Sequence, residues 1–247
     1  MDTKEELQKK IAESSYSEFS EKLSNYLRIQ QPLIYLTCKE EKRFTIFLND
    51  FSILGGYNTY TWNCDEGLCR LLDEYFEYLP DKNLKDSIEI LEYIEKYSKS
   101  LMNKLEMIQQ MKKQGIRGIL YVLFDGFRFI NNPIFERKLK NISNLNSMVS
   151  VIITGPRTGY STLDNLMPFL ETPMPNKKEY ELLINEIITG VENNMPYFRK
   201  EVDINKDTLL EILEGLTIIE AERIFSYSLV ENRKLDLDTI RKMRYEI

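Results

Sequence analysis

Apolar residues occur along the first part of the chain in two alternating spacings. Short runs of consecutive apolar, β-branched and aromatic residues are typical of strands buried on both faces, whereas apolar residues three or four positions apart indicate one side of a helix. The runs predict strands at residues 32–38, 57–62, 118–124, 147–155 and 169–175. Helical spacing predicts helices at residues 3–29, 40–54, 84–114 and 135–142. Such strands are joined by right-handed crossovers, so the pattern predicts a parallel sheet with helices on both faces.

Some of these segments leave alternatives open. The polar stretch ESSYS at residues 13–17 is a point at which the first helix splits, and residues 84–114 fit one long helix or a pair of helices. Residues 65–79, DEGLCRLLDEYFEYL, predict a loop followed by a short helix.

The composition changes near residue 175, because only helical spacing follows. It predicts helices at residues 176–191, 205–216, 217–233 and 235–247. We therefore expect an N-terminal helix at 1–30, an α/β domain at 31–175 and an all-helical subdomain at 176–247.

One acid follows the third strand directly. The run GILYVLFDGFRF, residues 118–129, places Asp125 and Gly126 at the end of the apolar segment. The strand that carries the magnesium-binding acid of a phosphate-binding ATPase has this appearance. An acid in this place can also cap the next turn. The second acid that follows in hydrolytic ATPases is replaced by Gly126, so no carboxylate that activates water is evident.

The loop at the position of a phosphate-binding loop lacks the residues that bind phosphate. A phosphate cradle uses glycines, so that backbone N–H groups point at the anion, and then a Lys and a Ser or Thr. The loop after the first strand, TCKEEKRF at residues 37–44, has no glycine, and Glu40 and Glu41 would repel phosphate. The pattern G-x-x-x-x-G-K-[ST] occurs nowhere. The nearest imitation, GPRTG at 155–159, also fits an ordinary turn after a strand.

Composition narrows the remaining chemistry. The formal charge is -6, from 33 Lys plus Arg and 39 Asp plus Glu, which disfavours nucleic acid as a partner. Without histidine, every mechanism and metal site that needs an imidazole is excluded. The three cysteines are one short of a thiolate zinc site, so we expect no metal. No apolar run approaches the length of a membrane span and the start is not a secretory signal, so we expect no membrane segment and a cytoplasmic location.

A series of ordered segments suggests a family. They are PLIYLTCKEEKR, YTWNCDEGL, LYVLFDGFRFINNPIFERKLKNI, VIITG, FLETPMPNKKEYELLINEI and EGLTIIEAERIF. Their order resembles the leading half of AAA family ATPases of the hypothetical-chloroplast-reading-frame type, found in algal plastids and many bacteria. The resemblance runs from about residue 20 to the end of the chain. In those proteins a degenerate AAA-like domain precedes a second AAA domain that hydrolyses ATP. The resemblance implies an AAA-like parallel sheet sandwiched by helices and a helical lid subdomain.

The resemblance also assigns weak candidates for nucleotide binding. Asp125 lies where the magnesium acid of a working AAA module would be, Thr154 lies in the strand expected to act as a sensor, and Arg223 lies near the expected sensor arginine of the lid. The family's hydrolysing domain would follow about where this chain stops. The chain is then either a piece of a longer ATPase or a stand-alone degenerate module.

The function that follows is a noncatalytic AAA-like module without a phosphate-binding loop. It would act in assembly, substrate positioning or regulation, by contacting copies of itself or a partner AAA ATPase. We expect no catalytic residue and no cofactor. One alternative is a nucleotide-binding domain that uses ATP and magnesium in an altered pocket, with weak ATPase activity through Asp125, Thr154 and Arg223. Another is a scaffold that docks through residues 84–114.

Overall fold

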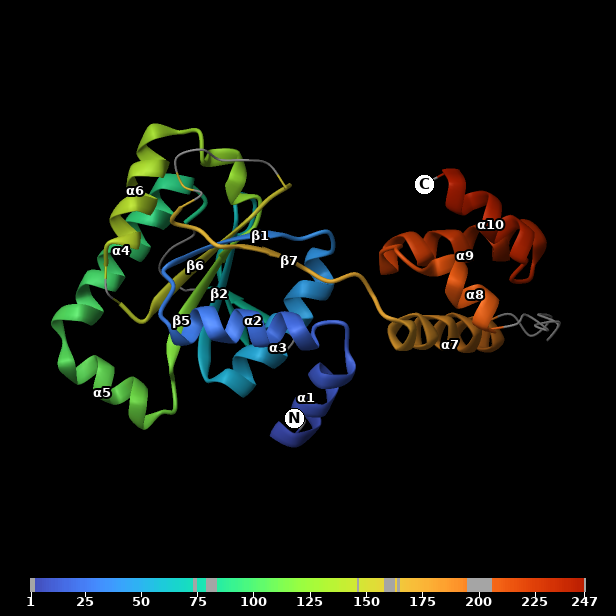
Figure 1. The fold of residues 1–247 in the computed structure, drawn as a ribbon, viewed down its shortest axis with the longest axis horizontal. Coiled ribbons are helices and arrows are strands. Elements are labelled where there is room, and N and C mark those ends of the chain that lie inside the picture. The colour runs from blue at the N-terminus through green and yellow to red at the C-terminus, as the bar shows by residue number, and fades with distance from the viewer. Residues whose placement is uncertain are drawn as a thin grey trace. The chain divides into compact units, whose positions relative to one another are not determined.

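The computed structural model of the chain describes residues 3–72, 75–78, 84–145, 147–157, 163, 165–194 and 206–246, and Figure 1 shows its elements. Contacts between residues divide the chain into two units. One contains Met1–Ile11 with Tyr16–Thr172, and the other contains Ala12–Ser15 with Pro173–Ile247. The division into domains at 1–30, 31–175 and 176–247 stays a prediction.

A mixed sheet forms the centre of the first unit. Within the described residues it has seven strands in the order β4-β3-β2-β5-β6-β1-β7. Their bounds are β1 Leu33–Thr37, β2 Tyr57–Asn63, β3 Gly67–Leu72, β4 Tyr75–Tyr78, β5 Gly118–Leu123, β6 Val149–Thr154 and β7 Phe169–Glu171. β2, β5, β6, β1 and β7 run parallel, whereas β3 pairs antiparallel with both β2 and β4. The predicted α/β fold class is confirmed, with a hairpin added at one edge.

That hairpin corrects the sequence analysis, because residues 65–79 are not a loop and a short helix. Their described part forms β3 and β4. Gly67 has φ 81°, which lets the chain reverse after β2, and Leu68 then lies opposite Trp62. Leu68, Cys69 and Leu71 are all buried, so the apolar residues of β3 do not alternate with polar ones. Over so few residues a strand buried on both faces has no period that separates it from a helix.

Helices cover both faces of the sheet. One face carries α1 Lys4–Glu13, α2 Ser17–Arg28 and α3 Glu41–Gly55, and the other carries α4 Ser87–Asn103 and α6 Pro133–Ser143, with α5 Leu105–Lys113 following α4. The strands supply both cores by alternation: Leu33 and Tyr35 face α4 and α6, while Ile34 and Leu36 face α2 and α3. The first predicted helix is split into α1 and α2, and residues 84–114 form a pair.

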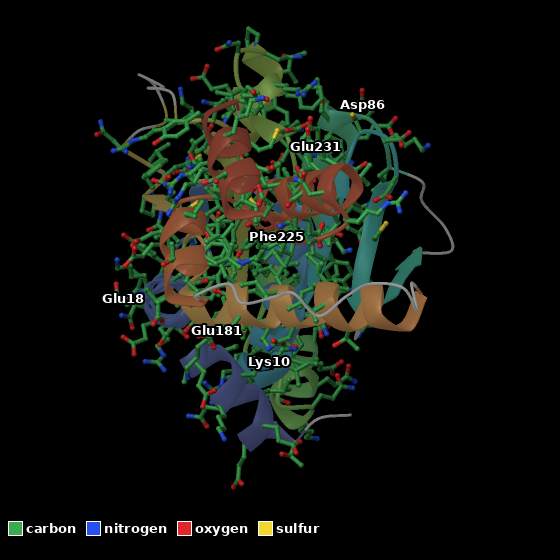
Figure 2. The ribbon with its side chains drawn as sticks, turned by 90° about the vertical axis from the view of Figure 1, so that its right-hand side faces the viewer. Lys10, Glu18, Asp86, Glu181, Phe225 and Glu231 are labelled. Atoms are coloured by element: carbon green, nitrogen blue, oxygen red, sulfur yellow. The ribbon has the colours of Figure 1, made fainter. Side chains whose placement is uncertain are left out.

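The second unit is helical. It contains α7 Lys177–Asn194, α8 Lys206–Leu213, α9 Ile218–Asn232 and α10 Leu237–Glu246. Phe225, fully buried, packs between these helices (Figure 2). Thr217 and Glu220 form a capping box that begins α9, and the Tyr180 hydroxyl donates to the Leu216 carbonyl at 2.5 Å. In the described part of the chain, none of the helices has the length and apolar character that a membrane crossing requires.

Aromatic side chains hold α3 against its neighbours in the first unit. Phe44 is fully buried, and its ring lies 6.1 Å from that of Phe19 and 6.4 Å from that of Phe124, both nearly perpendicular. Edge-to-face pairs of this kind add to the stabilisation that burial gives. Phe44 therefore connects α2, α3 and the end of β5.

We expect Phe44→Ala to lower the free energy of unfolding by about 3–5 kcal/mol, because it leaves a cavity among these rings. Ile46→Ala, in the same helix, is the control: Ile46 is 51% exposed, so its truncation should cost no more than about 0.5 kcal/mol. Urea denaturation followed by fluorescence of Trp62, the chain's single tryptophan, measures both. Equal losses for the two variants would contradict the packing described for α3.

Candidate functional site

The carboxyl ends of the parallel strands meet at one edge of the sheet. β1 lies between β6 and β7, yet the chain leaves β1 for β2, on the far side of β5 and β6. Open α/β sheets bind ligands outside the carboxyl ends of strands at such a change of direction. The candidate site is therefore built from the residues that follow β1, β5 and β6.

Asp125 and Thr154 meet at this edge. The Asp125 backbone N–H donates to Thr154 Oγ1 at 2.9 Å, and this hydroxyl donates to the Leu123 carbonyl at 3.4 Å. Asp125 has φ 56°, a left-handed conformation that a short polar residue tolerates. Thr154 is 3% exposed, so its hydroxyl holds the turn after β5 and is shielded from solvent.

The Asp125 carboxylate points away from this hydrogen bond. Its side chain is 48% exposed, and Oδ2 lies 3.3 Å from Nη2 of Arg128. Close packing explains why a glycine follows Asp125. A Cβ on Gly126 would lie 3.0 Å from Ile153 Cγ2 and 3.2 Å from Leu123 Cβ. A second acid at this position would require Ile153 or Leu123 to shift by a few tenths of an ångström.

Arg223 belongs to the second unit, on the exposed side of α9. The structure thus brings together two of the three candidate residues, both in the first unit. The role of all three in nucleotide binding stays a prediction.

The loop between β1 and α3 carries a buried carboxylate. Glu40, at the N-cap of α3, is 4% exposed, and its Oε2 lies 3.1 Å from Nη1 of Arg43. The Arg43 guanidinium lies over the Tyr16 ring, 4.8 Å from its centroid. Burial raises the pKa of the neighbouring Cys38 to about 11, against a hydrogen bond from the Glu40 backbone. At neutral pH Cys38 is therefore a protonated thiol with little nucleophilic character.

The imitation of a phosphate loop at residues 155–159 is described only as far as Arg157, so Thr158 and Gly159 lie outside the described residues. The Gly155 N–H donates to the Leu36 carbonyl at 3.0 Å, and the Pro156 carbonyl accepts from the Tyr35 hydroxyl at 2.8 Å. These backbone groups are used within the sheet, which favours an ordinary turn.

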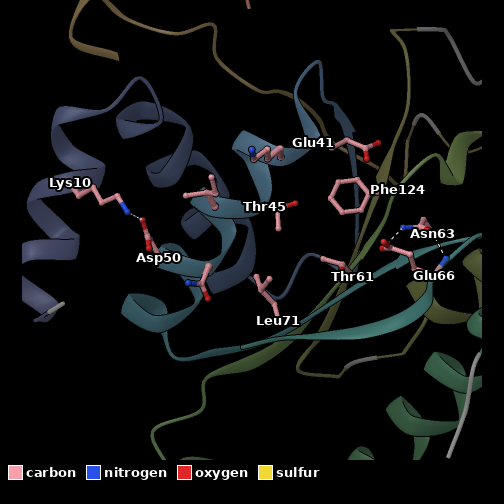
Figure 3. Close-up of a pocket in the computed structure, with 12 residues that line it drawn as sticks. Lys10, Glu41, Thr45, Asp50, Thr61, Asn63, Glu66, Leu71 and Phe124 are labelled. Carbon is pink, nitrogen blue, oxygen red and sulfur yellow. Dashed lines mark hydrogen bonds and ion pairs between the residues drawn. The ribbon is translucent and has the colours of Figure 1, made fainter. Parts of the chain in front are cut away.

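A pocket of about 580 Å³ lies beside α3, and Figure 3 shows it. We call it the α3–hairpin pocket, because α3 forms one wall, and β2, the β2–β3 turn and Leu71 of β3 form the other. Lys10 and Asp50, 2.9 Å apart, lie at one end, and Glu41 with Phe124 at the other. The pKa of Glu41 is raised by burial and then by the negative charges of Asp125 and Glu66.

Sequence reasoning missed this pocket, because one wall depends on a hairpin that it did not predict. Glu66 lies in the β2–β3 turn, where only the pairing of the two strands brings it near α3. Among the residues that the structure describes, no group of three or more Cys, Asp and Glu side chains is arranged to hold a metal ion.

We expect Thr154→Val to lower the free energy of unfolding by about 1–3 kcal/mol, because it leaves the Asp125 N–H without its acceptor. Thr154→Ser keeps the hydroxyl and should retain most of that stability. Urea denaturation of the two variants measures the difference. A valine variant as stable as the serine variant would show that the hydrogen bond does not hold this turn.

A family model described as SpoVK-like AAA ATPase, N-terminal domain, matches residues 19–171, more than half of the chain and all within the first unit. No curated protein matches the chain significantly.

Solved structures add a similarity in fold. A chain of the HORMA:CdnC:Trip13 complex of E. coli MS115-1 superposes with a TM-score of 0.57 and 11% identity, over 98% of this chain and 92% of that one. The Walker-type ATPase PABY2304 of Pyrococcus abyssi gives 0.49 and 12%, over 94% and 71%, which is too distant to carry an argument. The sheet, its helices and the family match agree: the chain belongs to the SpoVK-like AAA ATPase family, as its N-terminal domain.

Proposed function

We propose that this chain is a noncatalytic AAA-like module that acts in assembly, substrate positioning or regulation of an AAA ATPase. The observation that carries the proposal is the buried Glu40 carboxylate at the start of α3. A helix N-terminus after the first strand is where an AAA fold would bind phosphate, because its N–H groups and dipole attract an anion. Here the chain's own carboxylate is buried at the N-cap residue, where it makes no capping hydrogen bond to the helix N–H groups and pairs with Arg43.

The residues around this position do not fit ATP with magnesium. Residues 37–44 contain no glycine, so the backbone cannot wrap closely around a phosphate. Glu41 and Asp125 add negative charge near Glu40, and the raised pKa of Glu41 reflects burial together with repulsion from Asp125 and Glu66. A triphosphate would meet the same repulsion.

Exposed apolar side chains support a role in assembly. On α9, Ile219 is 46% exposed, Tyr227 45% and Val230 85%, and helical spacing places them on one side of the helix. Exposed apolar residues gathered on one face are typical of surfaces that contact other proteins. AAA domains assemble through head-to-tail contacts, and a domain that has lost hydrolysis can retain those surfaces.

We also propose that the chain is related to AAA ATPases of the hypothetical-chloroplast-reading-frame type. In that type a hydrolysing AAA domain would follow this one, and that domain would be its expected partner. The similar solved chain is part of a HORMA:CdnC:Trip13 complex. That complex is a property of the other protein. It supports partner contacts of this chain only through the shared fold.

One geometric feature favours nucleotide binding as a second candidate function. The Asp125 backbone N–H donates to Thr154 Oγ1 at 2.9 Å, so these two residues lie together at the strand ends. Binding through an altered pocket would depend on the exposed Asp125 carboxylate.

Sedimentation velocity tests the assembly role. We expect the 29.3 kDa chain to form larger species as its concentration rises, or in a mixture with a hydrolysing AAA ATPase from the same organism. Val230→Asp should weaken this association, because it places a charge on the exposed face of α9. Lys242→Ala, an exposed change on α10, is the control and should leave it unchanged. A strict monomer in both settings would contradict the proposal.

A further inference from the structure

The α3–hairpin pocket has the dimensions of a binding site. Its volume of about 580 Å³ falls within the range of about 300–1,000 Å³ that is usual for pockets that hold small ligands. It lies between α3 and the part of the sheet that β2 and β3 form, and Leu71 and Phe124 at its wall belong to the aromatic core cluster. The proposed function leaves this pocket without a role.

One end of the pocket is acidic and aromatic. Figure 3 shows the Phe124 ring between Glu41, at the start of α3, and Glu66, in the β2–β3 turn. Asn63 Nδ2 donates to Glu66 Oε2 at 2.9 Å, and Asn63 Oδ1 accepts from the Glu66 N–H at 2.7 Å. These two hydrogen bonds hold the Glu66 carboxylate in place before any ligand arrives.

The charges along the wall favour a cation at this end. The charged residues that line the pocket are Lys10, Glu41, Lys42, Asp50 and Glu66. Lys10 is paired with Asp50 at the far end (Figure 3). At the acidic end Glu41 and Glu66 outnumber Lys42, and Asp125 nearby is paired with Arg128, so this end keeps a net negative charge. The raised pKa of Glu41 agrees with a negative charge at this end. Its causes are burial and the neighbouring acids Asp125 and Glu66, and no cation is among them.

An organic cation fits this end better than a metal ion. The described residues offer no set of three acidic or thiol ligands for a metal. An aromatic ring between two carboxylates matches a guanidinium group, which is planar, lies flat against aromatic rings and donates paired hydrogen bonds to carboxylates. Beyond this end the wall becomes apolar, with Ile46 and Leu71.

We propose that the α3–hairpin pocket binds a segment of a partner protein through an arginine side chain. The guanidinium pairs with Glu41 and Glu66 beside the edge of Phe124, which is 6% exposed, and an apolar residue next to the arginine contacts the exposed side chain of Ile46. The inference goes beyond the proposed function and does not rest on it, because the pocket lies entirely within one copy of the first unit.

Titration of a blocked dipeptide, acetyl-leucyl-arginine amide, into the full chain tests the proposal, with amide resonances of Thr61 and Glu66 as the readout. The matched probe is acetyl-leucyl-citrulline amide, which has the same shape without the charge. We expect saturable binding of the arginyl peptide and at least about tenfold weaker binding of the citrullinyl peptide, since charge-assisted hydrogen bonds are lost.

Variants of the pocket's acidic residues test whether the arginyl peptide binds in the α3–hairpin pocket. Glu41 and Glu66 are both exposed, so the double variant Glu41→Gln/Glu66→Gln should fold and should weaken arginyl peptide binding by about tenfold or more. Glu89→Gln is the matched control, because Glu89 is also an exposed acid in the first turn of a helix and lies outside the pocket. It should bind as the unaltered chain does. Absence of saturable binding, equal affinity for both peptides, or full affinity in the double variant would overturn the proposal.

Discussion

Parallel pairing of β1, β6 and β5 is the constraint on which the candidate site depends. Leu123 lies opposite Ile153, and Leu36 lies opposite Thr154, so the three strands end at the same level. Every residue of β5 and β6, and every residue of β1 except Thr37, is buried, and a shift by one position would move each apolar side chain to the wrong core. This register brings the Asp125 backbone to the Thr154 hydroxyl and places the start of α3 beside both.

The start of α3 differs from an anion site in both charge and shape. The loop before it has no glycine to wrap around a phosphate, Glu40 is buried there with Arg43, and Glu41 lies close to Asp125. A buried carboxylate is costly without a partner, so Arg43 and its contact with the Tyr16 ring are needed to keep Glu40 in place. The same surplus of negative charge that disfavours a nucleotide favours a cation in the α3–hairpin pocket.

The sequence predicts the elements and residues that depend on the local pattern of apolar and polar positions. The apolar runs identify β1, β2, β5, β6 and β7, and the position of Asp125 after a run places it at the carboxyl edge of the sheet. The missing glycines in residues 37–44 are likewise visible without a structure. The β3–β4 hairpin could not be predicted, because a strand buried on both faces lacks a period, and the pocket depends on that hairpin. The steric reason for Gly126 needs the distance to Ile153, which only the packing of β5 against β6 supplies.

Calorimetric titration of ATP and of ADP, each with magnesium, into the full chain measures whether the carboxylates at the start of α3 exclude phosphate. We expect no measurable heat of binding for either nucleotide. Binding in the micromolar range that is lost in Asp125→Ala would contradict this exclusion, because it would show a nucleotide site that works despite Glu40.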